Sequence, residues 1–112
     1  MIKDLNMDYI LRMKPELFTE YCKKQGITFV LSLQKLLKIQ YSQLNLVRIS
    51  LVTMLEKKDE IAIPEEDAER ITKNLSDIYL SMQLIEDRFN ILEELTKVLK
   101  VDITKHWLLV FD

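Results

Sequence analysis

Residues 30–55 read VLSLQKLLKIQYSQLNLVRISLVTML, and their apolar side chains recur at alternating steps of three and four. This spacing places them along one face of an α-helix. The resulting seam consists of Val30, Leu33, Leu37, Gln40, Leu44, Val47, Leu51 and Met54, with Gln40 as its one polar member. Other apolar residues beside the seam make it wider than the stripe of a two-stranded coiled coil. We therefore expect this helix to be covered on more than one side.

A second long helix is predicted after Pro64, where three acidic residues suit the positive end of a helix dipole. From Ala68 to Leu92 the apolar residues again recur at steps of three and four. Asn90 is expected to end this helix, and a short further helix would then carry Leu92, Leu95 and Leu99. Because the link at 59–63 is short, the two long helices should form an antiparallel hairpin at about 28–58 and 64–90.

The residues before this hairpin predict two shorter helices. Pro15 cannot continue a helix, so one helix should end near Met13 and another should begin at Pro15, the favoured first position. Gly26, the single glycine, should end the second one with a positive φ. The fold class is therefore predicted as all-α, an antiparallel helical bundle of four to five helices in one domain spanning residues 1–112.

Composition narrows the possible functions. The chain of 112 residues has 16 basic and 18 acidic side chains and a net charge of −2, so nucleic-acid binding through a broad basic surface is not expected. We see no apolar run long enough for a membrane span. Cys22 is the single cysteine, which excludes an intramolecular disulfide and suits a reducing compartment. A cytoplasmic location is the expectation, with Cys22 as a small core residue.

The usual catalytic motifs are absent from the sequence. One glycine cannot build a glycine-rich phosphate loop, and His106 is the single histidine. Carboxylates are the remaining candidates for chemistry, with Glu86, Asp87 and Glu94 on the second long helix. They suit Mg²⁺, which prefers oxygen ligands. Because neighbouring residues of a helix point in different directions, a solvated surface is the favoured interpretation of these acids.

The segment Asn74-Leu-Ser-Asp77 resembles the second metal-binding motif of the MazG-like, all-α nucleoside triphosphate pyrophosphohydrolases. That family holds Mg²⁺ with a Glu-x-x-Glu pair on one long helix and a Glu-x-x-Asp pair on the next. Here Asp77 is kept and Asn74 replaces the glutamate. Arg48 and Leu51 stand at the first pair, or Gln40 and Gln43 in a second register. The chain thus departs from the family at three of the four ligand positions.

This resemblance implies an alternative function. The chain would be a Mg²⁺-dependent nucleotide pyrophosphohydrolase, with Asp77 as the surviving ligand and Glu86, Asp87 or Glu94 in place of the lost ones. A cationic side chain could instead replace the metal, and Arg48 would then pair with Asp77 across the hairpin. Mg²⁺ is implied under this alternative alone; otherwise no cofactor is expected.

The favoured prediction is a non-catalytic protein-interaction or regulatory module, homodimeric and able to bind another protein. It depends on the excess of apolar surface over what one short chain can cover. Gln40 and Asn74 would set the helix register, or would lie at a solvent-facing edge. The apolar end of the chain would pack back on the bundle or dock on a partner. The candidate interaction residues are Gln40, Arg48, Asn74, Trp107 and Phe111.

Overall fold

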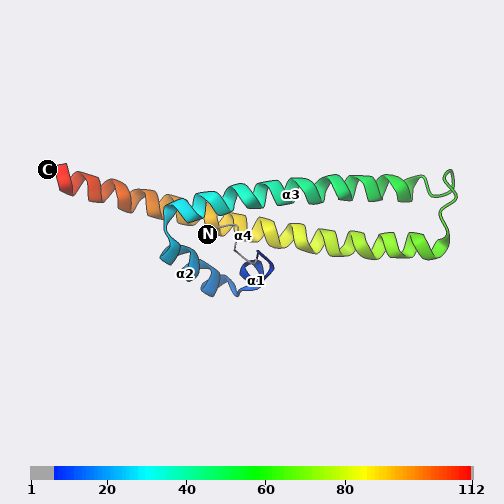
Figure 1. Ribbon diagram of the computed structural model, residues 1–112, viewed down its shortest axis with the longest axis horizontal. Coiled ribbons are helices and arrows are strands. Elements are labelled where there is room, and N and C mark those ends of the chain that lie inside the picture. Colours follow the sequence, from blue (N-terminus) through cyan, green and yellow to red (C-terminus); the bar gives the residue numbers. More distant parts are fainter. Residues whose placement is uncertain (1–6, 112) are drawn as a thin grey trace.

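The computed structural model describes the backbone of residues 7–111 and the side chains of residues 9–100. This part of the chain folds into α1 (Met7–Arg12), α2 (Pro15–Gln25), α3 (Ile27–Glu56) and α4 (Glu65–Phe111). The all-α prediction is confirmed. Figure 1 shows α3 and α4 lying antiparallel, with α1 and α2 beside the end of the hairpin where α3 begins. We call this end the root and the opposite end the tip.

The molecule is elongated. Its principal dimensions are 72, 22 and 21 Å, and its radius of gyration is 19.5 Å, against about 13 Å for a compact chain of this length. Part of the length comes from the end of α4, which continues past the root (Figure 1). No helix in the described part of the chain has an apolar run sufficient to cross a membrane.

The breaks before the hairpin lie where the sequence predicts them. α2 begins at Pro15, and the preceding residue, Lys14, is extended with φ −58° and ψ 146°. Gly26 separates α2 from α3 with φ 93° and ψ 178°, a combination that is open almost only to glycine. The Gly26 N–H donates to the Cys22 carbonyl and its own carbonyl accepts from the Val30 N–H, each at 3.1 Å. One residue thus ends one helix and begins the next.

The predicted end of the second long helix at Asn90 is wrong. α4 continues through Asn90 to Phe111 without a break. Asn90 is exposed, while Leu92 and Leu95 beyond it are buried. An asparagine inside a helix costs only a few tenths of a kcal/mol, and burial of the following leucines contributes more than that. The separate short helix is therefore not formed.

The core lies at the root, where α2 packs against both long helices. Its fully buried side chains are Phe18, Cys22, Val30, Leu33, Leu37 and Leu92. They come from α2, α3 and α4, so this half of the hairpin has three layers. Burial raises the pKa of the Cys22 thiol to about 11, which agrees with its predicted role as a core residue.

Arg88 connects the end of α1 to the hairpin through hydrogen bonds. This side chain is 7% exposed, and its Nε and Nη2 donate to the carbonyls of Leu11 (3.2 Å) and Met13 (2.7 Å). Its guanidinium also lies 5.5 Å from the centre of the Phe18 ring. A cation suits this place because the last carbonyls of a helix have no partner within the helix. Arg88 was not predicted as a buried residue, although it lies between the buried Ile85 and Leu92.

The predicted seam of α3 is fully buried over the root half alone. Leu33 and Leu37 are fully buried, whereas Val47 is 47% exposed and Met54 is 40% exposed. The expected cover on more than one side of this helix is therefore present at the root and incomplete over the second half of the seam. The physical cause is length: α1 and α2 are short and pack at the root, so within residues 7–111 the tip half of the hairpin consists of α3 and α4 (Figure 1).

Candidate functional site

From residue 39 to residue 54, the side of α3 that faces away from α4 exposes large apolar side chains and no charged one. We call this surface the outer face of α3. Its exposed residues are Ile39, Ser42, Gln43, Leu46, Ile49, Ser50 and Thr53, with Val47 and Met54 exposed at its border. Leu46 is 66% exposed and Ile39 is 56% exposed. In Figure 1, no helix of the described chain lies beyond α3 on this side.

The absence of charge sets this surface apart. Between Lys38 and Glu56, the one charged residue in the sequence is Arg48, and Arg48 is half-buried on the side toward α4. The exposed residues of α4 over the same part of the hairpin include Glu66, Glu69, Arg70, Lys73, Asp77, Glu86 and Asp87. Depletion of charge around exposed aromatic and aliphatic side chains is typical of the centre of a protein–protein interface.

A polar groove of about 440 Å³ lies between α3 and α4 on one side of the hairpin. Its lining includes Tyr41 and Arg48 from α3 and Tyr79, Glu86 and Asp87 from α4. The Tyr41 hydroxyl donates to Glu86 Oε1 at 2.7 Å. This hydrogen bond is the main cause of a raised pKa of Tyr41, since it favours the protonated phenol. The bond links the two long helices at mid-length.

Arg48 does not pair with Asp77, so that hypothesis is wrong. The Arg48 Nε donates to Asn45 Oδ1 at 2.9 Å, and Asp77 is exposed. Arg48 and Asp77 do lie at nearly the same level along the hairpin. Tyr79, two residues after Asp77, lines the same groove as Arg48. Residues two apart on a helix, however, point about 200° away from one another. Asp77 consequently lies on a different face of α4 from Tyr79.

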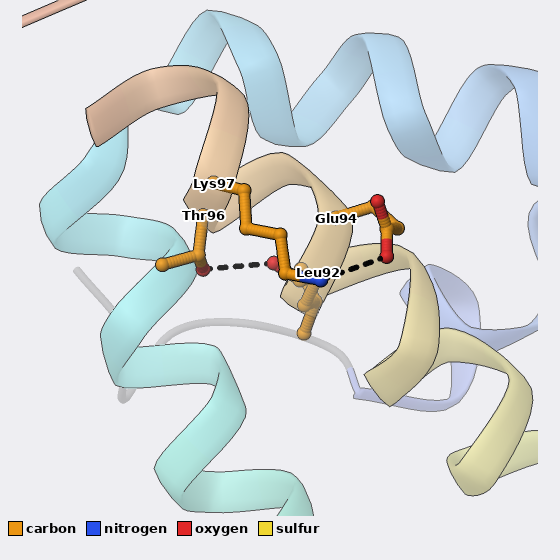
Figure 2. Close-up of polar contacts among 4 residues, drawn as sticks. All are labelled: Leu92, Glu94, Thr96 and Lys97. Atoms are coloured by element: carbon orange, nitrogen blue, oxygen red, sulfur yellow. Dashed lines mark hydrogen bonds and ion pairs between the residues drawn. The ribbon is translucent and has the colours of Figure 1, made fainter. Parts of the chain in front are cut away.

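The four acids named for the metal-binding alternative are spread along α4. Glu86 accepts from Tyr41, and Asp87 lines the same groove. Glu94 lies further toward the root and forms an ion pair of 3.3 Å with Lys97, as Figure 2 shows. Asp77 is exposed on another face. Within the residues whose side chains are described, no three acidic, histidine or cysteine residues are grouped so that they could hold a metal ion.

The remaining predicted residues have different surroundings. Gln40 is half-buried, and its buried Oε1 has no hydrogen-bond partner. It lies beside Leu11 and Leu44, at the point where α1 stops covering the hairpin. Asn74 is exposed near the tip, close to Met54 and Ile61. Trp107 and Phe111 lie beyond the residues whose side chains are described.

The arrangement therefore brings together one set of predicted residues and separates another. Arg48 shares a groove with Glu86 and Asp87, while Gln40 and Asn74 lie at separate places along the hairpin. The outer face of α3 was not singled out as a site by the sequence analysis. Its signal in the sequence is the run of 17 residues, 39–55, with a single charge. Comparisons with known proteins found no matching family model, no matching curated protein and no matching solved structure.

Proposed function

We propose that this protein is a non-catalytic helical interaction module that acts as a homodimer, with the outer face of α3 as its interface. One observation carries the proposal: between residues 39 and 54, α3 exposes large apolar side chains and no charged one on the side away from α4. They are Ile39, Leu46 and Ile49, and Val47 and Met54 are exposed at the border of this side. Contiguous apolar surface of this kind marks an interaction site on most proteins.

The same part of the molecule supports a regulatory role. Its two long helices expose a rigid surface, and the root anchors them through the three-layer core. A dimer built on this surface would leave the polar groove around Arg48 open to another protein, because the groove lies on the α4 side of α3. A cytoplasmic location completes the proposal, and the free thiol of Cys22 supports it.

The size of the outer face sets the expected affinity. Residues 39–55 span about 25 Å of helix, which is short for an obligate interface. We therefore expect a dimer that dissociates on dilution through the micromolar range. Sedimentation equilibrium or light scattering over a concentration series measures this directly. A chain that stays monomeric at several hundred micromolar would contradict the proposal.

A matched pair of variants locates the interface. Leu46 and Leu80 are both leucines, exposed by 66% and 65%, on α3 and α4 respectively. Leu46→Glu should abolish dimerisation, because it places two carboxylates in an apolar contact. Leu80→Glu should leave the dimer intact. Equal effects of the two variants would show that the interface does not lie on the outer face of α3.

A further experiment distinguishes this function from nucleotide hydrolysis. A ligand that binds the folded state alone raises the melting temperature. We expect no shift with Mg²⁺ and a panel of nucleoside triphosphates, and no release of pyrophosphate. A raised melting temperature together with release of pyrophosphate would show that the protein is a nucleotide hydrolase and would contradict the proposed interaction module. Asp77→Ala would then be expected to remove both effects.

A further inference from the structure

The distribution of charge along α3 determines how a second copy would lie on the outer face. The run 39–55, whose single charged residue Arg48 lies on the side toward α4, is bounded by Lys38 toward the root and by Glu56 toward the tip. Both side chains are exposed. Lys38 has its ammonium 5.6 Å from the centre of the Phe89 ring on α4. Within the described residues, neither Lys38 nor Glu56 forms an ion pair.

Lys38 and Glu56 are related by position as well as by charge. Each is nine residues from Val47, which is the midpoint of the run 39–55. Their separation of 18 residues is about five full turns of an α-helix. Both side chains therefore project from the same edge of the outer face.

We infer that the outer face of α3 pairs with the outer face of a second copy in an antiparallel orientation, with the twofold axis level with Val47. This inference rests on the homodimer proposed above. A twofold axis perpendicular to two antiparallel helices keeps each edge of one helix beside the same edge of the other. Lys38 of each copy then lies opposite Glu56 of the other, so the dimer contains two such pairs.

A parallel orientation does not form these pairs. It would place Lys38 level with Lys38 and Glu56 level with Glu56 on opposite edges of the interface, so neither side chain would meet an opposite charge. The charges beyond the run favour the antiparallel dimer too. Residues 56–70 around the tip contain seven acidic and three basic side chains, whereas residues 20–38 near the root contain four basic and one acidic. Antiparallel pairing brings the acidic tip of one copy to the basic root of the other.

Cysteine cross-linking tests the orientation. The native Cys22 is fully buried, so a cysteine introduced on the outer face is the reactive one. Leu46→Cys, next to the axis, should form a disulfide between copies. Ile39→Cys alone should not, because its two copies are about 24 Å apart along the helix, beyond disulfide reach. A mixture of Ile39→Cys and Thr53→Cys chains should form the mixed disulfide.

The outcomes separate the orientation from the dimer itself. Rapid self-linking of Ile39→Cys, without the mixed product, would show a parallel dimer and overturn this inference while leaving the homodimer in place. A monomeric wild-type mass, with no cross-link from Leu46→Cys, would overturn the proposed function as well. The mixed disulfide between positions 39 and 53 is expected from the antiparallel dimer alone.

A charge-reversal series tests the register independently. Lys38→Glu and Glu56→Lys should each weaken dimerisation by about tenfold, since each turns two attractive contacts into repulsive ones. The double variant should return the dissociation constant toward that of the wild type, because the pairs are restored with reversed charge. Additive losses in the double variant would overturn the pairing of Lys38 with Glu56. Raised salt should reduce all these differences.

Discussion

The root and the tip halves of the hairpin carry the same pattern of apolar residues and bury it to different degrees. Leu33 and Leu37 at the root are fully buried, while Val47 and Met54 further along the same seam remain 47% and 40% exposed. The difference comes from α1 and α2, which add a third layer at the root and end before the tip (Figure 1). An apolar seam indicates that a helix packs against other elements. The length of those elements determines how much of the seam they bury.

The largest expected effect compares one residue from each half. Leu37→Ala should lower the free energy of unfolding by about 3 kcal/mol, because it leaves a cavity in the core. Val47→Ala should cost about 0.5 kcal/mol, since its side chain is half-exposed in the single chain. Urea denaturation at concentrations where the protein is monomeric measures both values. Similar losses at the two positions would show that the tip half is covered as well as the root.

The next effect concerns the attachment of α1 at the root. Arg88→Met should destabilise the protein by about 2 kcal/mol, because two carbonyls lose a charged donor. Hydrogen exchange should become faster in α1 while the tip half of α3 keeps its protection. Arg70→Met is the control, because Arg70 is exposed near the tip and pairs with Asp67 within one turn. Its expected cost is below about 0.5 kcal/mol, and a loss as large as that of Arg88→Met would contradict the contrast.

A smaller effect is expected at the junction that begins the root. Gly26→Ala should cost about 1–2 kcal/mol, because alanine is strained at a φ of 93°. A Cβ added there meets no atom within 4 Å, so the cost is one of backbone conformation alone. Gln25→Ala, at the exposed end of α2, is the control and should be nearly neutral. Thermal unfolding compares them, and a Gly26→Ala variant as stable as the wild type would refute this account of the junction.

The smallest effect is chemical and again contrasts the two halves. The pKa of Cys22 is raised to about 11, so at pH 8 roughly one thiol in a thousand is ionised. Iodoacetamide should leave Cys22 unlabelled while it modifies a cysteine placed at Leu46. The labelling rate of Cys22 should rise about tenfold per pH unit up to pH 11. Fast labelling of Cys22 at pH 8 would show that the root opens readily.

The same thiol makes a small contribution to the dependence of stability on pH. Its folded-state pKa lies above the unfolded value of about 8.5, so the folded state holds the proton more tightly. This contribution is complete below that unfolded value. It is lost as the pH rises through the folded-state pKa of about 11. Cys22→Ala should remove this part of the alkaline transition.

Much of the fold could be predicted from the sequence, because the decisive signals are local. Pro15 and Gly26 restrict their own backbone angles, and α2 and α3 begin at Pro15 and Ile27. The steps of three and four identified both long helices. Asn90 was misread because its preference for a helix end is weak, and the buried leucines beyond it maintain the helix.

Less of the candidate site could be predicted, because the orientation of a side chain across two helices depends on their mutual rotation. The sequence placed Arg48 and Asp77 close to the same level, and the rotation of α4 put Asp77 on another face. Arg88 was missed for a related reason, since its partners are carbonyls 75 and 77 residues earlier in the chain.

The sequence by itself determined the helices, their order and the apolar, nearly uncharged character of residues 39–55. These properties follow from backbone restriction and from periodicity, which act over a few residues. The tertiary structure alone decided which part of the apolar seam is buried and which part is left for a partner. That outcome depends on the reach of α1 and α2 and on the relative rotation of α3 and α4, because burial is a property of the packed layers.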